Sequence, residues 1–115
     1  MSEDTLFARI ARGEIPSDKV YSDDDYYAFR DIEAQAPTHI LIIPRKPIPK
    51  ISDATVDDQA LLGGLLLKAA EIARAEGLEE DGYRFVINCG DHGGQTVYHL
   101  HLHILGGRQM VWPPG

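Results

Sequence analysis

The sequence predicts a single α+β domain with a mostly antiparallel five-stranded sheet, one long helix and one short helix. Three observations favour this class. The chain has 115 residues, which is the size of one domain. Its strand-like runs follow one another through short turns instead of alternating with helices, which is typical of an antiparallel sheet. One long stretch has helical periodicity and a wide apolar face, which predicts a helix covering one face of the sheet.

The short helix is predicted near the N-terminus, within residues 4–14 (DTLFARIARGE). Leu6, Phe7 and Ile10 share one stripe at the spacing of an amphipathic helix. Gly13 then ends the helical pattern.

Three strands are expected next. Residues 19–23 (KVYSD) and 26–32 (YYAFRDI) are rich in aromatic and β-branched residues, with acidic turn residues between them. This pattern predicts a hairpin. Residues 38–44 (THILIIP) form a strongly apolar run closed by Pro44, which predicts a buried strand.

The long helix is predicted to begin after Thr55, a suitable N-cap residue with Asp58 three positions on. Gly77 fits its C-terminal cap. Gly63 and Gly64 inside the helix each cost about 1 kcal/mol in propensity, so we expect close packing there. The apolar face comprises Leu61, Leu62, Leu65, Leu66, Ala69, Ile72 and Ala73.

The C-terminal third predicts two more strands and an irregular end. Residues 83–89 (YRFVINC) and 97–105 (VYHLHLHIL) have strand composition, and the glycine-rich loop 90–96 (GDHGGQT) joins them. Residues 106–115 (GGRQMVWPPG) are expected to form an irregular tail.

Charge and cysteine content narrow the classes of function. The formal net charge of −7 argues against binding to a nucleic-acid polymer or an anionic membrane surface, although a single nucleotide could still occupy a local pocket. The only cysteine is Cys89, which favours a reducing compartment and is expected to be a buried thiol. The first residues show neither a signal peptide nor a membrane anchor, so a cytoplasmic protein is expected.

Three of the five histidines stand at alternate positions in the last predicted strand: His99, His101 and His103. Side chains at alternate positions of a strand point to the same face. Val97 and these histidines should therefore share one face, while the leucines between them pack on the helix.

A solvated strand face and a metal site are two interpretations of this row. Histidine is the commonest metal ligand. However, the Cα atoms of His99 and His103 would lie about 13 Å apart in a strand, so their imidazoles could barely meet around one ion at about 2.1 Å. A metal site would need further ligands, for which His39 and Asp31 could serve.

A third interpretation is that the row handles a phosphate. Neutral imidazole is a competent nucleophile near physiological pH, and flanking imidazoles can donate to phosphate oxygens or to a leaving group. The adjoining loop supports this interpretation, because Gly93 and Gly94 allow backbone N–H groups to converge on an anion. Thr96 adds a hydroxyl and Asn88 an amide at the same end of the sheet.

At these residues the chain resembles the histidine triad superfamily of nucleotide hydrolases and transferases, whose signature matches HLHLHIL. The stretches LFARIARGEIPSDKVYSDDDYYAFRDIEAQAPTHILIIPRK, DGYRFVINCGDHGGQTVYHLHLHILGGRQ and WPPG resemble the branch of histidine triad nucleotide-binding proteins. The resemblance covers nearly the whole chain.

The resemblance implies a homodimer whose protomers join their sheets, with residues 106–115 near the partner's site. It implies binding of a purine nucleoside monophosphate and hydrolysis of purine nucleoside phosphoramidates through a nucleotidyl-histidine intermediate, with neither a metal nor a cofactor. Two alternatives remain open: a nucleotide-binding regulatory or scaffold module with incidental hydrolysis, and a dinucleoside polyphosphate hydrolase.

The resemblance also implies roles for individual residues. His101 matches the nucleophile, His99 and His103 flank it, and His39 and Thr96 complete the catalytic set. The positions implied to contact the substrate are Leu6, Phe7, Ile10, Phe29, Asp31, Ile32, Leu41, Asn88, Gly94, Gln95 and Trp112. Taken alone, Phe7, Phe29 and Leu41 would be ordinary core residues, Asp31 a turn acid and His39 a structural histidine.

Two positions depart from many relatives. Thr96 stands where serine is frequent, and its extra methyl group could narrow the space for the leaving group. Arg30 is expected to place positive charge near the base pocket.

Overall fold

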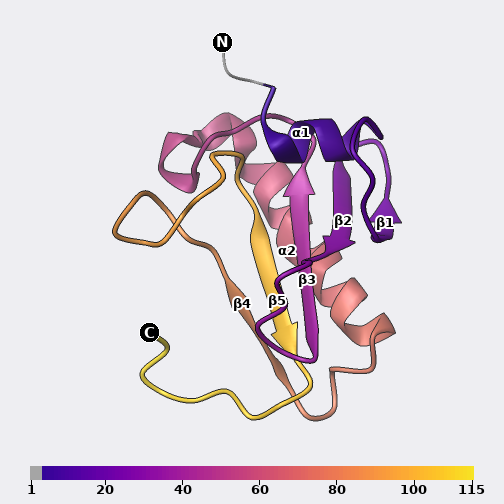
Figure 1. Cartoon of the computed structure of the whole chain (residues 1–115). Coiled ribbons are helices and arrows are strands. Elements are labelled where there is room, and N and C mark those ends of the chain that lie inside the picture. The colour runs from indigo at the N-terminus through magenta and orange to yellow at the C-terminus, as the bar shows by residue number, and fades with distance from the viewer. Residues whose placement is uncertain (1–3) are drawn as a thin grey trace.

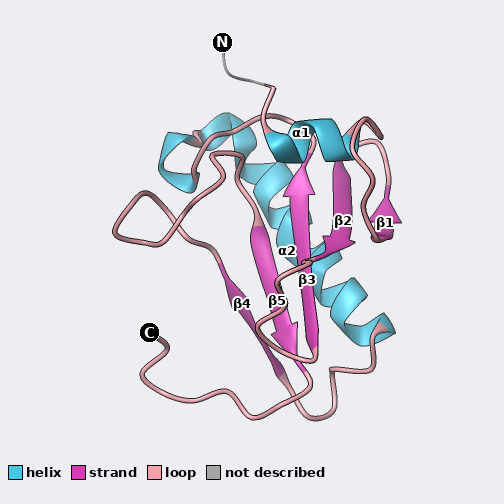
Figure 2. Ribbon diagram, viewed as in Figure 1, coloured by secondary structure: helices cyan, strands magenta, loops and turns pink. Residues whose placement is uncertain are grey.

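The computed structural model describes residues 4–115, and its elements form one sheet with a helix layer on each side (Figure 1; Figure 2). The sheet has the strand order β1-β2-β3-β5-β4, and every pair of neighbours is antiparallel. The predicted fold class is confirmed. The helices are α1 (Leu6–Ala11) and α2 (Gln59–Ala75), and two short 3₁₀ turns, Ile51–Asp53 and Val56–Asp58, precede α2. The strands are β1 (Lys19–Ser22), β2 (Tyr26–Arg30), β3 (Thr38–Pro44), β4 (Tyr83–Val86) and β5 (Leu102–Gly106).

The long helix α2 covers one face of the sheet, as predicted. Alternate residues of the two central strands point toward it, and Ile40, Ile42, Leu102 and Ile104 are all 0% exposed. Leu65 contributes to the same cluster from the helix side. This face is the main hydrophobic core.

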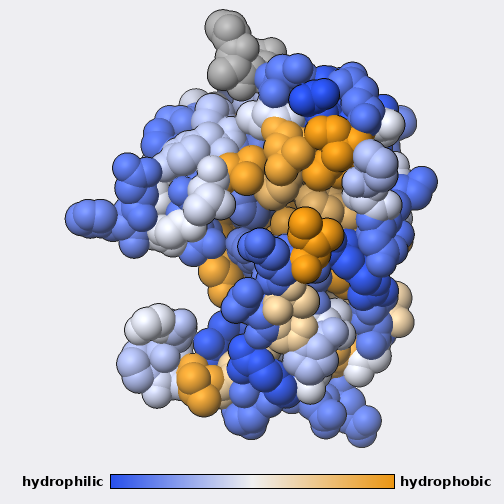
Figure 3. Space-filling model, viewed as in Figure 1, coloured by the Kyte–Doolittle hydropathy of each residue, from blue (hydrophilic) through white to orange (hydrophobic). Residues whose placement is uncertain are grey.

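The short helix α1 lies over the upper part of the opposite face (Figure 1). A second, smaller cluster forms there, because the odd-numbered positions of β3 point away from α2. Figure 3 shows apolar side chains gathered in a hollow beneath α1. The buried members of this cluster are Phe7, Ile10, Tyr27, Phe29, Leu41 and Ile43.

The helix starts follow the local sequence signals. The Thr55 side chain accepts from the backbone of the 3₁₀ turn Val56–Asp58, and Asp58 reaches back to the Thr55 N–H, which completes the predicted capping box. This turn leads directly into α2, which itself begins at Gln59. Gly77 takes a φ of +80° just after α2, a conformation that suits glycine at a helix end.

The two glycines inside α2 have different surroundings. The Tyr26 hydroxyl donates to the Leu61 carbonyl at 2.6 Å, and a Cβ on Gly64 would lie 2.2 Å from that hydroxyl oxygen. The predicted close packing is therefore present at Gly64. Nothing lies within 4 Å of the corresponding position on Gly63, so none of the described residues packs closely there and the expectation for that glycine stays a prediction.

The two strands of the C-terminal third show the largest shortening relative to the prediction. The last strand begins at Leu102 rather than at position 97, because Pro44 has no N–H with which to extend the ladder of β3. The Leu100 N–H instead donates to the Ile48 carbonyl at 2.7 Å. The strand β4 ends at Val86, whose partner in β5 is His103. Among the described strands β4 pairs with β5 alone, so it ends with this last pair.

This shortening also corrects the expectation for Cys89. The residue lies in a loop, is only partly buried, and its Sγ lies 3.4 Å from the Ser52 Oγ.

Among the described residues, no helix has the length and apolar character needed to cross a membrane.

Candidate active site

A cavity of about 430 Å³ opens beneath α1 on the face of the sheet that α2 does not cover (Figure 3). One part of its wall is apolar, and another part carries His101, His103 and Thr96. Most of the predicted site residues therefore meet in one place. The predicted residues that line it are Leu6, Phe7, Ile10, Phe29, Asp31, Ile32, Leu41, Thr96, His101 and His103.

His101 is held in one tautomer. Its Nδ1 lies 2.7 Å from the backbone carbonyl oxygen of His99. A carbonyl oxygen can only accept, so Nδ1 carries the proton and Nε2 keeps a free lone pair. The ring of Phe7 contacts the His101 ring edge-on, with centroids 4.9 Å apart. A buried imidazole with an available lone pair therefore lines the cavity.

His99 does not stand beside His101 in the cavity, which corrects the predicted row. It is 0% exposed and lies outside the cavity lining. Its Nε2 lies 2.8 Å from the Pro44 carbonyl and its Nδ1 lies 3.1 Å from the Thr5 hydroxyl. The strand geometry that would present it begins only at Leu102, so its side chain turns into the protein.

His103 and His39 form a second hydrogen-bonded chain. The Gln35 backbone N–H donates to His39 Nδ1 at 3.0 Å, so the His39 proton is on Nε2. That N–H donates to His103 Nδ1 at 2.9 Å. His103 therefore carries its own proton on Nε2, the only ring nitrogen left to donate. The chain makes His103 a neutral hydrogen-bond donor in the wall of the cavity.

Burial keeps these imidazoles neutral at pH 7. It lowers the pKa of His39, His99 and His101 below the ordinary value. For His103, burial together with the neighbouring His101 and His39 lowers the pKa from 6.5 to about 4. The site therefore combines a neutral imidazole that has a free lone pair, His101, with a neutral hydrogen-bond donor, His103.

Asp31 joins this cluster. Its Oδ2 lies 3.5 Å from His39 Nε2, and one ligand atom each from Asp31, His39 and His103 fall within 4.8 Å of one another. These are the partners that the metal interpretation requires. The donor set nevertheless fits a metal poorly. A neutral His39 that bound a metal through Nε2 would carry its proton on Nδ1, but Nδ1 already accepts a hydrogen bond from the Gln35 N–H.

The glycine-rich loop is braced by two of the predicted contact residues. The Gln95 side chain is buried, accepts from the Gly90 N–H and donates to the carbonyls of Pro49 and Val97. The Asn88 amide donates to the Gly93 carbonyl at 2.6 Å. Both side chains therefore support the loop and lie outside the cavity lining.

Gly94 also lies outside the lining, and its φ of +83° suits glycine. Trp112 is 81% exposed in the C-terminal tail. The guanidinium of Arg84 donates to the neighbouring Val111 carbonyl at 2.9 Å and so fastens the tail to β4. Substrate contacts by Gly94, Gln95, Asn88 and Trp112 remain predictions.

Sequence reasoning missed the residues between α1 and β1 that line the cavity. Ile15, Pro16, Ser17 and Asp18 belong to its wall. The available signal was their position directly after the helix that carries Phe7.

Arg30 also lines the cavity, but its charge is compensated. Its guanidinium donates to Glu76 at 3.0 Å and lies 3.9 Å from the Asp18 carboxylate. The positive charge expected near the base pocket is therefore paired.

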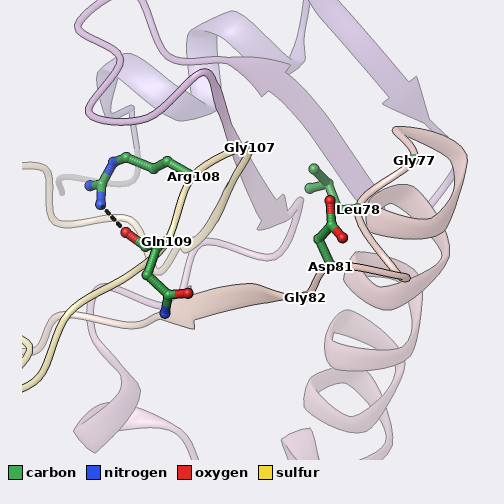
Figure 4. A pocket seen from close by; sticks show the side chains of 7 residues that line it. All are labelled: Gly77, Leu78, Asp81, Gly82, Gly107, Arg108 and Gln109. Atoms are coloured by element: carbon green, nitrogen blue, oxygen red, sulfur yellow. Dashed lines mark hydrogen bonds between the residues drawn. The ribbon is translucent and has the colours of Figure 1, made fainter.

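A second hollow of about 390 Å³ lies beside the C-terminal end of α2 (Figure 4). Asp81 and Arg108 are its charged residues, and Figure 4 shows them on opposite sides of the hollow. None of the predicted site residues lines it. The full lining is Gly77, Leu78, Asp81, Gly82, Gly107, Arg108 and Gln109.

Comparison with known sequences gives one family match and close relatives. The model of the HIT domain matches residues 12–110. A HIT-like protein of Synechococcus elongatus is 62% identical over 115 residues, with 100% of each chain covered. The purine nucleoside phosphoramidase of Escherichia coli is 54% identical over 110 residues, which are 96% of this chain and 92% of that protein.

Comparison with solved structures agrees. A HIT family hydrolase from Legionella pneumophila superposes with a TM-score of 0.96 at 57% identity, covering 97% of this chain and all of that one. A histidine triad nucleotide-binding protein from Candida albicans superposes with a TM-score of 0.81 at 30% identity, covering 96% of this chain and 83% of that one.

Proposed function

The chain belongs to the HIT domain family, and from that premise we propose that it hydrolyses purine nucleoside phosphoramidates. The observation that carries the proposal is the hydrogen bond from His101 Nδ1 to the His99 carbonyl at 2.7 Å. This bond leaves the Nε2 lone pair of a neutral imidazole free to attack phosphorus. The relative in Escherichia coli named as a purine nucleoside phosphoramidase supports the substrate class.

The proposed reaction has two steps. His101 Nε2 attacks phosphorus, the P–N bond breaks, and the leaving nitrogen takes a solvent proton relayed through the Thr96 hydroxyl. The positive charge on the nucleotidyl-imidazole is shared with the His99 carbonyl through Nδ1–H. Water then attacks phosphorus, the bond between phosphorus and His101 Nε2 breaks, the nucleoside monophosphate is released, and one proton returns to solvent. One water is consumed, and an amine and a monophosphate are formed.

The proposal assigns each part of the substrate to one part of the cavity. An apolar wall with few polar groups suits the face of a purine, and Phe7, Ile10 and Leu41 supply it. The Asp31 carboxylate can accept from the ribose hydroxyls. The neutral donor His103 faces the phosphate oxygens in this arrangement and stabilises their charge.

Hydrolysis without a metal is part of the proposal. The Gln35 N–H holds His39 in the tautomer that donates through Nε2, so a metal would have to break both bonds of this chain. We therefore expect activity to survive strong chelation, with no stoichiometric metal in elemental analysis of the active protein.

The substitution His101→Asn tests the mechanism. The asparagine amide can still donate to the His99 carbonyl but has no lone pair equivalent to Nε2. We expect hydrolysis of an adenosine phosphoramidate to fall by at least about 10³-fold while AMP binding persists. The wild-type protein quenched during turnover should carry an acid-labile, base-stable nucleotidyl label that this variant lacks. Full activity of the variant would contradict the nucleophile assignment.

The same sample separates the rival functions. Cleavage of diadenosine polyphosphate in preference to the phosphoramidate would favour a dinucleoside polyphosphate hydrolase. Turnover near zero on all phosphoramidates, with tight AMP binding, would favour a regulatory binding module.

We also propose that the protein is a homodimer. The strand β4 is an outer strand, with β5 on one side only. The outward face of α2 carries Leu66 and Leu67, which are 46% and 70% exposed, together with the unfilled space at Gly63. A second copy that packs on this face would bury these leucines and explain a glycine that otherwise costs about 1 kcal/mol.

The substitution Gly63→Ala tests the dimer. If α2 packs against α2 of a second copy, the added methyl group should weaken self-association in sedimentation experiments. A monomeric wild-type protein that becomes more heat-stable on this substitution would contradict the proposal.

A further inference from the structure

The first residue before α1 makes two hydrogen bonds through one hydroxyl. The Thr5 Oγ1 accepts from the Ala8 N–H at 3.0 Å, which caps α1. The same oxygen lies 3.1 Å from His99 Nδ1. The residue is therefore both the N-cap of the helix and a neighbour of the histidine cluster, although it lies 94 positions from His99 in the chain.

The direction of the second bond follows from the partners. His99 Nε2 lies 2.8 Å from the Pro44 carbonyl, which can only accept, so the neutral ring has its proton on Nε2. Nδ1 is then an acceptor, and the Thr5 hydroxyl must donate to it. Asparagine, aspartate, serine, threonine and glycine all serve as N-caps, but an aspartate carboxylate or a glycine has no proton to donate to Nδ1.

His99 is held at both ring nitrogens and has no exposed surface. Its backbone carbonyl accepts the Nδ1–H of His101 at 2.7 Å. The two hydrogen bonds of the His99 ring hold its side chain in place and so restrain the backbone of this irregular segment. The His99 carbonyl in turn orients the His101 ring. The segment has no ladder bonds of its own before Leu102. The peptide group that carries the His99 carbonyl is held from two sides, by the hydrogen bonds of the His99 ring and by the Leu100 N–H, which donates to the Ile48 carbonyl at 2.7 Å.

The helix makes a second contact with the nucleophile. Phe7, in the first turn after Thr5, places its ring edge-on to the His101 ring at a centroid distance of 4.9 Å. The α1 helix therefore reaches the nucleophile directly through Phe7 and indirectly through Thr5 and His99.

We infer that Thr5 is a positioning residue for the nucleophile: by donating to His99 Nδ1 it holds the His99 carbonyl where it orients His101. The inference rests on the proposed function, in which His101 attacks phosphorus. It assigns to Thr5 a role beyond starting the helix.

The test compares Thr5→Gly with Thr5→Ser. Both residues start helices well, and glycine costs little at this position, but only serine can donate to His99. We expect kcat on an adenosine phosphoramidate to fall by about tenfold in Thr5→Gly with KM within about twofold, because misplaced reacting groups slow the chemical step. Thr5→Ser should retain the wild-type kcat.

A spectroscopic readout is independent of turnover. The ¹⁵N resonance of His99 Nδ1 should move toward that of an unbonded lone-pair nitrogen in Thr5→Gly and stay near the wild-type value in Thr5→Ser. Equal kcat values for the two variants with unchanged His99 resonances would overturn the inference. A raised KM with an unchanged kcat would also overturn it, since that is the result of a role in the helix alone. Inactivity of the wild-type protein would instead count against the proposed function, and the His99 resonances would still test the contact.

Discussion

The two faces of the sheet use the same strands but differ in what their side chains do. Toward α2, Ile40, Ile42 and Leu102 belong to the main hydrophobic cluster and are 0% exposed. Toward α1, the neighbouring positions His39, Leu41 and His103 line or support a cavity. A change of one residue along a strand therefore passes from the core to the candidate site.

The face toward α2 contributes mainly to stability, whereas the face toward α1 carries the candidate site. On the α2 face, the burial of apolar area stabilises the fold and tolerates no polar group without a partner. On the α1 face, buried imidazoles are tolerated because they form hydrogen bonds inside the protein, as His99 does with Thr5 and the Pro44 carbonyl. Within the described residues, no buried side-chain nitrogen or oxygen lacks a hydrogen-bond partner.

The largest expected effects come from adjacent residues of β5. Leu102→Ala should lower the free energy of unfolding by about 2–5 kcal/mol and leave kcat of the folded protein nearly unchanged. His103→Asn should do the reverse, with kcat lower by about 10²-fold and unfolding changed little. The asparagine oxygen can still accept from His39 Nε2–H, but it offers no donor at the position of His103 Nε2.

Urea unfolding and phosphoramidate turnover measure the two quantities. If Leu102→Ala lowered kcat as much as His103→Asn did, after correction for the folded fraction, the separation between the faces would not hold.

A smaller effect is expected where the core is closely packed. Gly64→Ala brings a methyl group against the Tyr26 hydroxyl, because the Cβ would lie 2.2 Å from its oxygen. We expect a loss of about 1–3 kcal/mol of stability despite the gain in helix propensity. Tyr26→Phe combined with Gly64→Ala is the matched control, since it removes the clashing oxygen and should recover part of the loss. Thermal unfolding checks both variants, and a stabilised Gly64→Ala protein would show that the helix shifts freely.

The smallest effect concerns pH between 7 and 8. Burial lowers the pKa of His101 below its ordinary value of 6.5 and lowers that of His103 to about 4, so both are mainly neutral over this interval. We expect kcat/KM to change by less than about twofold. An acidic limb should appear only below the ordinary imidazole range, and a midpoint near 7 would contradict the assignment of neutral groups.

Stability should show the same groups with a defined sign. Below about pH 6.5 the unfolded chain binds protons that the folded His103, with its pKa of about 4, does not bind. Stability should therefore be full above that range and decrease as the pH falls from about 6.5 toward 4. Urea midpoints measured across this interval test the sign.

Much of the fold could be predicted from the sequence. The capping box at Thr55, the apolar run of β3 and the periodicity of α2 are local signals, and each appears where it was expected. Most of the site could also be predicted, because alternation along β3 and β5 separates His39 and His103 from the core residues beside them.

The sequence alone determined the fold class, the apolar faces and the gathering of histidines at one end of the chain, because these depend on local periodicity and composition. Only the tertiary structure decided that His99 turns inward, that Gln35 and His39 set the tautomer of His103, and that Thr5 reaches His99. The His39–His103 and Thr5–His99 bonds join residues 64 and 94 positions apart, and local pattern carries no information about them. Beyond Pro44, which has no N–H to extend the β3 ladder, the segment before Leu102 is not held in strand geometry. Long-range hydrogen bonds therefore position His99 and His101.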